Sequence, residues 1–132
     1  MDESIAKAIV RRNGWLSGEE AWVQDAVLAR ARPRKFEPQE FVFQTEEHPG
    51  GIYGVVDGGF GILVASGTGE MALCHIIRRG TWFGHGPVLT GKPRKMTFQA
   101  VEPSVSFHVP LSALNEISTT YPDFRLRLAA LS

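Results

Sequence analysis

Apolar positions in the first third of the chain follow a helical period. The pattern predicts one helix over residues 4–12 that ends at Asn13 and Gly14. Ser17 and Glu20 have the spacing of a capping box, in which each side chain bonds the other residue's backbone N–H, so we expect a second helix to begin there. Pro33 should end that helix, because the residue before a proline is displaced from the helical backbone region. The expected apolar face of the second helix is Trp22, Val23, Ala26 and Val27.

From Phe36 onward the apolar period becomes two, which is the period of half-buried strands. Short apolar runs are separated by clusters of Gly, Pro, Asp and Ser that favour turns. The main runs cover residues 41–43, 52–56, 61–65, 71–77 and 105–109. Hairpins need turn residues that tolerate positive φ, and such residues stand at 57–59 (Asp-Gly-Gly) and 66–69 (Ser-Gly-Thr-Gly). Several short strands at this spacing predict a closed or two-sheet β architecture.

The end of the chain returns to a helical pattern. Residues 111–117 predict a helix, and Pro122 suits the first turn of a last helix. That last helix carries Phe124, Leu128 and Leu131 at helical spacing and stops within three turns, at Ser132, with its apolar stripe unfinished. We therefore expect one mainly β domain over 1–132, with helices in 1–35, strands in 36–110 and helices in 111–132. Its expected interior includes Phe43, Val55, Leu63, Leu73, Phe83, Phe98 and Phe107.

Length and charge suggest a small cytoplasmic module. A chain of 132 residues suffices for one domain with a core. Its 14 Lys and Arg balance 14 Asp and Glu, so no global field draws it to nucleic acid or to an anionic membrane. Charges begin at Asp2, and no apolar stretch has signal-peptide or membrane length. Cys74 lies in an apolar run and is interpreted as a small core residue. The basic run at residues 30–35 is interpreted as a solvated helix end.

The segment from Phe83 to Met96 carries the candidate chemistry. Two glycine-rich turns frame a short apolar stretch and deliver Arg94 to its far end. Proteins use this construction when backbone N–H groups and a guanidinium converge on an anion. The candidate ligand-binding residues are Phe83, Gly84, His85, Gly86, Pro87, Arg94 and Lys95.

This segment resembles the phosphate-binding cassette of the cyclic-nucleotide-binding domain in the Crp/Fnr family of bacterial regulators. The family pattern is Phe-Gly-Glu, an apolar run, a small loop with Gly, and Pro-Arg followed by Ser or Thr and by Ala. Four landmarks follow in the family's order, at residues 36–44, 52–58, 79–84 and 91–94, and the resemblance covers roughly residues 14–131. It implies a double-stranded β-helix, that is, a jelly-roll-like β-roll that senses a ligand.

The resemblance also implies how such a domain is used. In the family, the last helix lengthens into a dimerising coiled coil, and a helix-turn-helix domain after it binds DNA. No residues remain here for that domain, so DNA would be bound only through a part that is absent from this chain. We expect either the sensor fragment of a longer regulator or a stand-alone relative, with homodimerisation through the C-terminal helix and no membrane association.

The cassette departs from the family pattern at three positions. His85 replaces the glutamate, which in the family accepts hydrogen bonds from the ribose hydroxyl, and Lys95 and Met96 replace the small residues after the arginine. His85 cannot act as a carboxylate acceptor, and Met96 should narrow the cleft. We therefore expect no cofactor and weak or no binding of cyclic AMP and cyclic GMP. An effector, if one is sensed, should be an anion that contacts Arg94.

Two other functions stay open at this point. The chain could be a stand-alone β-roll that docks a protein partner and has no ligand. It could also be a small cupin-like metalloprotein, since His48, His75, His85 and His108 superficially suggest a metal site, although no His-x-His pair precedes a suitably spaced glutamate. The sequence contains no Ser-His-Asp order, nucleophile elbow or paired-carboxylate motif, so we expect no enzyme.

Overall fold

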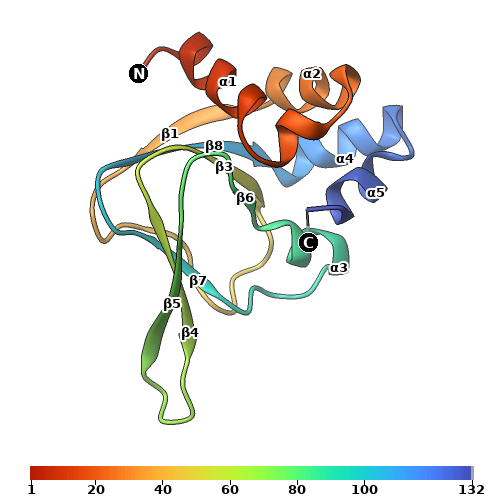
Figure 1. Ribbon diagram of the computed structural model, residues 1–132. Helices are drawn as coiled ribbons and strands as arrows, with labels where there is room; N and C mark the ends of the chain where they lie inside the picture. Colours follow the sequence, from red (N-terminus) through yellow and green to blue (C-terminus); the bar gives the residue numbers. More distant parts are fainter. Residues whose placement is uncertain (132) are drawn as a thin grey trace.

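Two antiparallel four-stranded sheets form the β part of the molecule (Figure 1). The structure is a computed structural model, in which residues 1–131 are described. One sheet has the strand order β1-β8-β3-β6 and the other the order β2-β7-β4-β5. The strands are β1 (Arg32–Phe36), β2 (Phe41–Phe43), β3 (Gly51–Asp57), β4 (Phe60–Ala65), β5 (Met71–Ile77), β6 (Trp82–Phe83), β7 (Thr97–Ala100) and β8 (Ser104–Pro110). The predicted fold class, a jelly-roll-like β-roll with flanking helices, is confirmed.

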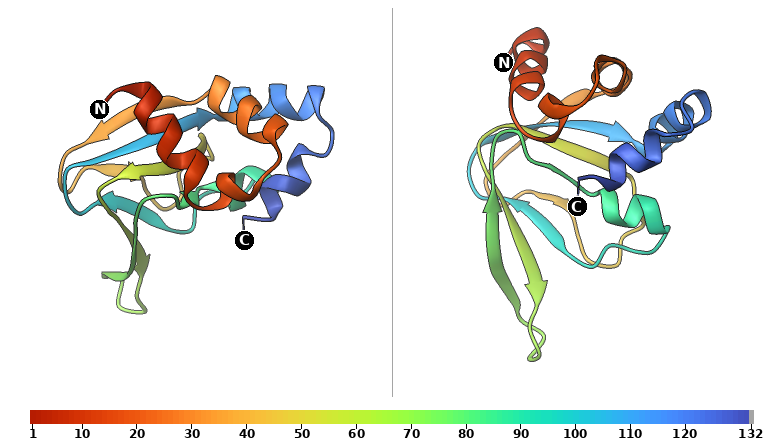
Figure 2. Two further views of the ribbon diagram at one scale, coloured as in Figure 1. Left: turned by 45° about the horizontal axis from the view of Figure 1, so that its top comes forward. Right: turned by 45° about the vertical axis from the view of Figure 1, so that its right-hand side comes forward.

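Helices from both ends of the chain cover the outer face of the first sheet and lie side by side (Figure 2). They are α1 (Glu3–Arg12), the 3₁₀ turn η1 (Trp15–Gly18), α2 (Ala21–Ala29), α4 (Leu111–Thr120) and α5 (Phe124–Ala129). Leu16, Val27 and Leu114 from these elements pack with Phe107 of β8 in one fully buried core. Arg127 of α5 donates to Glu20 beside α2 at 2.9 Å. This core fixes the sheet on which the rest of the roll is built.

A second core fills the inside of the roll and consists mainly of aromatic rings. Phe83 and Phe98, from opposite sheets, are stacked with ring centroids 4.5 Å apart and an interplanar angle of 11°. Phe43 lies 4.9 Å from Phe98, also centroid to centroid. Of the expected interior residues, Phe43, Val55, Phe83 and Phe98 lie in this core, and Phe107 lies in the core beneath the helices. Those five predictions are confirmed.

The β4–β5 hairpin differs from the sequence prediction, because it extends away from the roll (Figure 1). A β-bulge follows Ile62, which pairs with His75, whereas Leu63 pairs with Leu73, so that Cys74 is the extra residue. Beyond the bulge the facing sheet no longer covers the hairpin. Leu73 is therefore 54% exposed, Leu63 is only partly buried and Cys74 is exposed. The interior placement of Leu73 and Leu63 and the core interpretation of Cys74 were wrong.

The N-terminal part also needs two corrections. The basic run ends a helix only at Arg30, the C-cap of α2. From Arg32 it forms β1, an edge strand paired with β8, so the β part starts four residues before Phe36. A proline is tolerated there because an edge strand bonds to a neighbour on one side only, so the missing N–H can face solvent. The capping box is absent as well, since the Ser17 hydroxyl donates to the Gly14 carbonyl within η1. Helix α2 begins at Ala21, without a side-chain cap.

The apolar stripe at the C-terminus is part of the domain's own core. The predicted last two helices exist as α4 and α5. Phe124 is fully buried and Leu128 is 1% exposed, because α5 folds back against the other helices, and Leu131 packs partly buried against the same core. The stripe therefore offers little free apolar surface for subunit pairing, and homodimerisation through this helix stays a prediction. Within residues 1–131, no helix is long and apolar enough to cross a bilayer.

Candidate functional site

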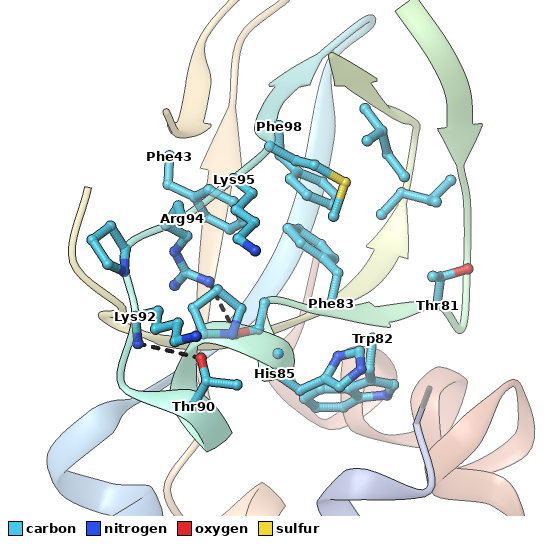
Figure 3. A pocket seen from close by; sticks show the side chains of 17 residues that line it. Phe43, Thr81, Trp82, Phe83, His85, Thr90, Lys92, Arg94, Lys95 and Phe98 are labelled. Atoms are coloured by element: carbon cyan, nitrogen blue, oxygen red, sulfur yellow. Dashed lines mark hydrogen bonds between the residues drawn. The ribbon is translucent and has the colours of Figure 1, made fainter. Parts of the chain in front are cut away.

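A cavity of about 520 Å³ lies between the candidate segment and the inner face of the second sheet. Seventeen residues line it (Figure 3). The structure brings all seven sequence-predicted residues to this one wall: Phe83, Gly84, His85, Gly86, Pro87, Arg94 and Lys95. The candidate segment thus forms one wall of the cavity.

Two glycines set the path of the chain along this wall. After β6, Gly84 has a φ of 91° and starts the short helix α3 (His85–Thr90), and Gly91, with a φ of 74°, ends it. The Gly91 N–H donates to the Pro87 carbonyl at 2.8 Å. A Cβ on Gly84 would lie 3.0 Å from Nη1 of Arg94 and 3.1 Å from the Gly51 carbonyl oxygen. Glycine is needed at 84 both for its backbone conformation and for the close approach of the arginine.

Arg94 points into the molecule rather than into solvent. It is 2% exposed. Its Nη1 donates to the Gly84 carbonyl at 2.9 Å and its Nη2 to the Gly51 carbonyl at 3.0 Å. Its guanidinium carbon lies 3.8 Å from the centroid of the Phe43 ring, within cation–π distance. The side chain therefore joins α3, β3 and β2 at the floor of the cavity.

The backbone around Arg94 is held as firmly as its side chain. Its N–H donates to the Glu47 carbonyl at 2.8 Å, and its carbonyl accepts from the Glu46 N–H at 2.7 Å. These paired bonds fasten the loop after α3 to the loop after β2. The arginine is pre-positioned before any ligand arrives.

Among the described residues, no carboxylate lies within salt-bridge distance of Arg94. A guanidinium has five N–H donors. Two are used by the carbonyls, and Nε is buried without a hydrogen-bond partner. Burial lowers the pKa of Arg94, and the neighbouring Tyr53 and Glu47 oppose that shift. A buried, incompletely bonded cation is the feature that an anionic ligand would satisfy.

The remaining polar groups of the wall are cationic or neutral. His85 is half-buried, and burial lowers the pKa of its imidazole below the ordinary 6.5, so the ring is neutral at pH 7. Lys92 and Lys95 are exposed. None of the 17 described residues that line the cavity is acidic. Met96 is 42% exposed and also lines the cavity.

Comparison with known proteins establishes the family. A family model described as a cyclic nucleotide-binding domain matches residues 33–121, which is most of the chain. The chain belongs to the cyclic nucleotide-binding domain family. The resemblance inferred from the sequence is thereby confirmed. The search of curated protein sequences gave no match.

Solved structures show the same fold for this cyclic nucleotide-binding domain. A Ruegeria pomeroyi protein, provisionally assigned as a cyclic nucleotide-binding protein, is 26% identical with a TM-score of 0.85, over 99% of this chain and 58% of that one. The Thermus thermophilus catabolite activator protein is 19% identical with a TM-score of 0.77, over 89% and 55%. The sensor domain of a Pseudomonas aeruginosa transcriptional regulator is 16% identical with a TM-score of 0.76, over 97% and 86%.

The compared proteins are regulatory and binding proteins rather than enzymes. The chain spans 58% of the Ruegeria protein and 55% of the catabolite activator protein. It therefore corresponds to little more than half of each. The shared part is the roll with its flanking helices, which contains the whole cavity.

The domain also has a large apolar wall that sequence reasoning had not assigned to the site. It consists of Phe43, Ile62, Ile77, Trp82, Pro93 and Phe98. The inward positions of Phe43 and Phe98 follow from strand alternation, so these two could have been found. Trp82 is placed by a glycine: a Cβ on Gly54 would lie 2.5 Å from the indole. Trp82 also contacts Trp15 edge-on, with ring centroids 5.7 Å apart.

The histidines that suggested a cupin-type metal site do not come together. Within residues 1–131, no group of three or more His, Cys, Asp or Glu side chains is placed to hold a metal ion. His48 and His75 are exposed. His108 stacks on Tyr53, with ring centroids 4.6 Å apart and an interplanar angle of 16°. Only His85 lines the cavity.

The cassette helix is tied to the C-terminal part of the domain. Nη2 of Arg125, on α5, donates to the Leu89 carbonyl at the end of α3, at 3.0 Å. Val88 of α3 is buried in the same core as Phe124 and Leu128 of α5. Any movement of α3 would therefore change its contacts with α5.

Proposed function

We propose that this domain is the effector-sensing part of a Crp/Fnr-type transcription regulator that acts in the cytoplasm. In this proposal DNA is bound by another domain of the full regulator. The effector is an anion other than a cyclic nucleotide, and it contacts Arg94. The family assignment and the regulators among the structural neighbours support the regulatory role.

The observation that carries the proposal is the state of Arg94. It lines a cavity, is 2% exposed and has no carboxylate within salt-bridge distance among the described residues. A buried charge without a salt bridge is costly, and a bound anion would offset that cost beyond the longer-range attraction of Glu47. Two of its five N–H donors are bonded to carbonyl oxygens, and Nε is buried without a hydrogen-bond partner.

The same cavity is poorly suited to a cyclic nucleotide. In the resembled family, a glutamate of the cassette accepts a hydrogen bond from the ribose hydroxyl, and that position is His85 here. No other lining residue supplies a carboxylate. A hydrogen bond to a charged group contributes about 1.5–3 kcal/mol, so losing the acceptor should weaken binding by about ten- to a hundredfold. We therefore consider the cyclic-nucleotide pocket degenerate, because it lacks this acceptor.

One observation favours a ligand-free role instead. The two carbonyl bonds of Arg94 and its contact with Phe43 already hold the guanidinium in place. In the alternative, Arg94 is purely structural and the domain docks a protein partner. The two functions differ in what the arginine does when an anion is present.

A comparison of two conservative variants separates these functions. Arg94→Lys keeps the charge but removes the planar guanidinium, and Arg79→Lys makes the same change at an exposed arginine paired with Asp57. Thermal unfolding is measured with cyclic AMP, cyclic GMP, phosphate and a panel of small carboxylates. We expect an anion that raises the Tm of the unmodified chain and of Arg79→Lys but not of Arg94→Lys. A micromolar Kd for a cyclic nucleotide, or no response to any anion, would contradict the proposal.

A further inference from the structure

The cavity wall is divided between an apolar side and a cationic side. The strands provide aromatic and aliphatic side chains, including that of Trp82, whereas Lys92, Arg94 and Lys95 come from the loop after α3 (Figure 3). Phe83 and Phe98 are stacked face to face along the apolar side. A ligand that matches both sides must have an anionic end and an apolar body.

Polar groups that could bond a sugar are scarce in this wall. Among the described residues that line the cavity there is no Asn, Gln, Ser, Tyr, Asp or Glu. The side-chain hydroxyls belong to Thr81 and Thr90, and that of Thr90 already accepts the Lys92 N–H at 3.2 Å. Ligand hydroxyls buried here would lose their hydrogen bonds to water and find few replacements. The wall therefore disfavours a ribose or any other polyol.

The charges point to one negative group on the ligand. Arg94 is buried, whereas Lys92 and Lys95 are exposed. A single carboxylate balances the buried guanidinium and matches its planar fork of N–H donors. A second negative charge would be taken into an apolar cavity without a buried cation to balance it.

We propose that the cavity binds an aromatic carboxylate, with its carboxylate at Arg94 and its ring system against Phe43, Phe83 and Phe98. The proposal rests on the proposed function, because it names the chemical class of that effector. A volume of about 520 Å³ lies inside the usual range for small-molecule pockets and accommodates a bicyclic ring.

Calorimetry of the unmodified chain with 2-naphthoate, 2-naphthamide and cyclic AMP tests the class directly. The amide has the same ring system and no charge. We expect 2-naphthoate to bind at least about tenfold more tightly than 2-naphthamide, since it alone forms charge-assisted bonds with Arg94. Cyclic AMP should bind more weakly than 2-naphthoate.

A matched pair of variants tests the location without altering Arg94. Met96 and Met71 are exposed to a similar degree, 42% and 45%, and only Met96 lines the cavity. Met96→Glu places a carboxylate at the cavity, so 2-naphthoate should bind several-fold more weakly to it. Met71→Glu, on the projecting hairpin, should bind like the unmodified chain.

The contrary outcomes are distinct. Equal affinity for 2-naphthoate and 2-naphthamide, or equal loss in both methionine variants, overturns the assignment of the carboxylate to Arg94. Binding of a phosphorylated sugar through Arg94, without binding of 2-naphthoate, overturns the aromatic class but leaves the proposed function standing. If no anion binds and Arg94→Lys changes only stability, both proposals fail.

Discussion

The guanidinium of Arg125 donates a hydrogen bond to the carbonyl oxygen of Leu89 at 3.0 Å, and so connects α5 to α3, the helix that borders the cavity. The donor is exposed, so the bond should contribute at most about 1 kcal/mol to stability. Its effect should be local. It restrains the end of α3, where the Gly91 N–H bonds back to Pro87.

Replacing Arg125 with Met should therefore loosen α3 while leaving the domain folded. Hydrogen exchange at the amide of Gly91 should become faster, because fewer bonds hold this turn. Arg11→Met is the control, since Arg11 bonds Gln24 and Asp25 in the N-terminal helices. Unchanged exchange at Gly91 in Arg125→Met would show that α3 is held by packing alone.

Cyclic AMP and cyclic GMP should bind weakly or not at all to the unmodified chain, as measured by calorimetry at millimolar nucleotide. His85→Glu combined with Met96→Ala should recover part of the affinity, because the pair restores a carboxylate acceptor and removes side-chain bulk at the cavity. The matched control is His75→Glu with Met71→Ala on the exposed strand β5. Recovery in the control as well would mean that general charge, not the cassette, sets the affinity.

Gly54→Ala should destabilise the domain by about 1–3 kcal/mol. The added Cβ would meet three indole carbons of Trp82 at 2.5, 2.6 and 2.7 Å, and the buried indole has little room to move. Gly67→Ala, in the turn of the hairpin, would meet nothing within 4 Å. Urea unfolding of both variants measures the difference. Equal midpoints would show that Trp82 can shift without cost.

The 132-residue chain should associate only weakly and should bind duplex DNA only marginally. Its C-terminal apolar stripe is buried in its own core, and its formal net charge is zero. Sedimentation measures the association, and a titration of DNA at increasing salt should show non-specific affinity that disappears. Tight sequence-specific binding by this chain alone would reveal a DNA-reading surface on the roll.

Stability should fall as the pH is lowered through the region below 6.5, partly because of His108. Burial is the main cause that lowers the pKa of His108, with Arg34 and Arg94 acting in the same direction and the Gly50 carbonyl opposing them. The unfolded chain then takes up the proton at a higher pH than the folded one, so protonation favours unfolding in that window. His108→Gln should reduce this pH dependence of the urea midpoint, whereas His75→Gln at an exposed site should preserve it. An identical pH profile in His108→Gln would refute this assignment.

Strand alternation and glycine turns predicted most of the roll because both are local. The same logic failed at Arg32, because the strand that begins there has four exposed positions, one of them Pro33, and forms only by pairing with β8. It also failed at Leu73, because one bulge at Cys74 shifts the register of the hairpin. Neither the pairing of β1 with β8 nor the bulge at Cys74 can be predicted from local periodicity.

The candidate site was recoverable from sequence to a similar degree. The cassette pattern located Arg94 and the glycines around it, since they are close neighbours in the chain. The bond of Arg94 to the Gly51 carbonyl spans 43 residues, so no spacing rule could predict that the guanidinium faces inward. The apolar wall likewise depends on pairing between strands that are distant in the sequence, because Ile62 of β4 lies opposite Phe98 of β7 in the second sheet.

The contact between Trp15 and Trp82 gives the cavity an optical signal of its own. Trp82 forms part of the wall, and its ring lies 5.7 Å from that of Trp15. The third tryptophan, Trp22, stacks on Tyr121 in the helical layer. Replacing Trp22 with Phe would leave emission from the Trp15–Trp82 pair alone. Binding of an aromatic acid could then be measured by the quenching of that emission, without any attached dye.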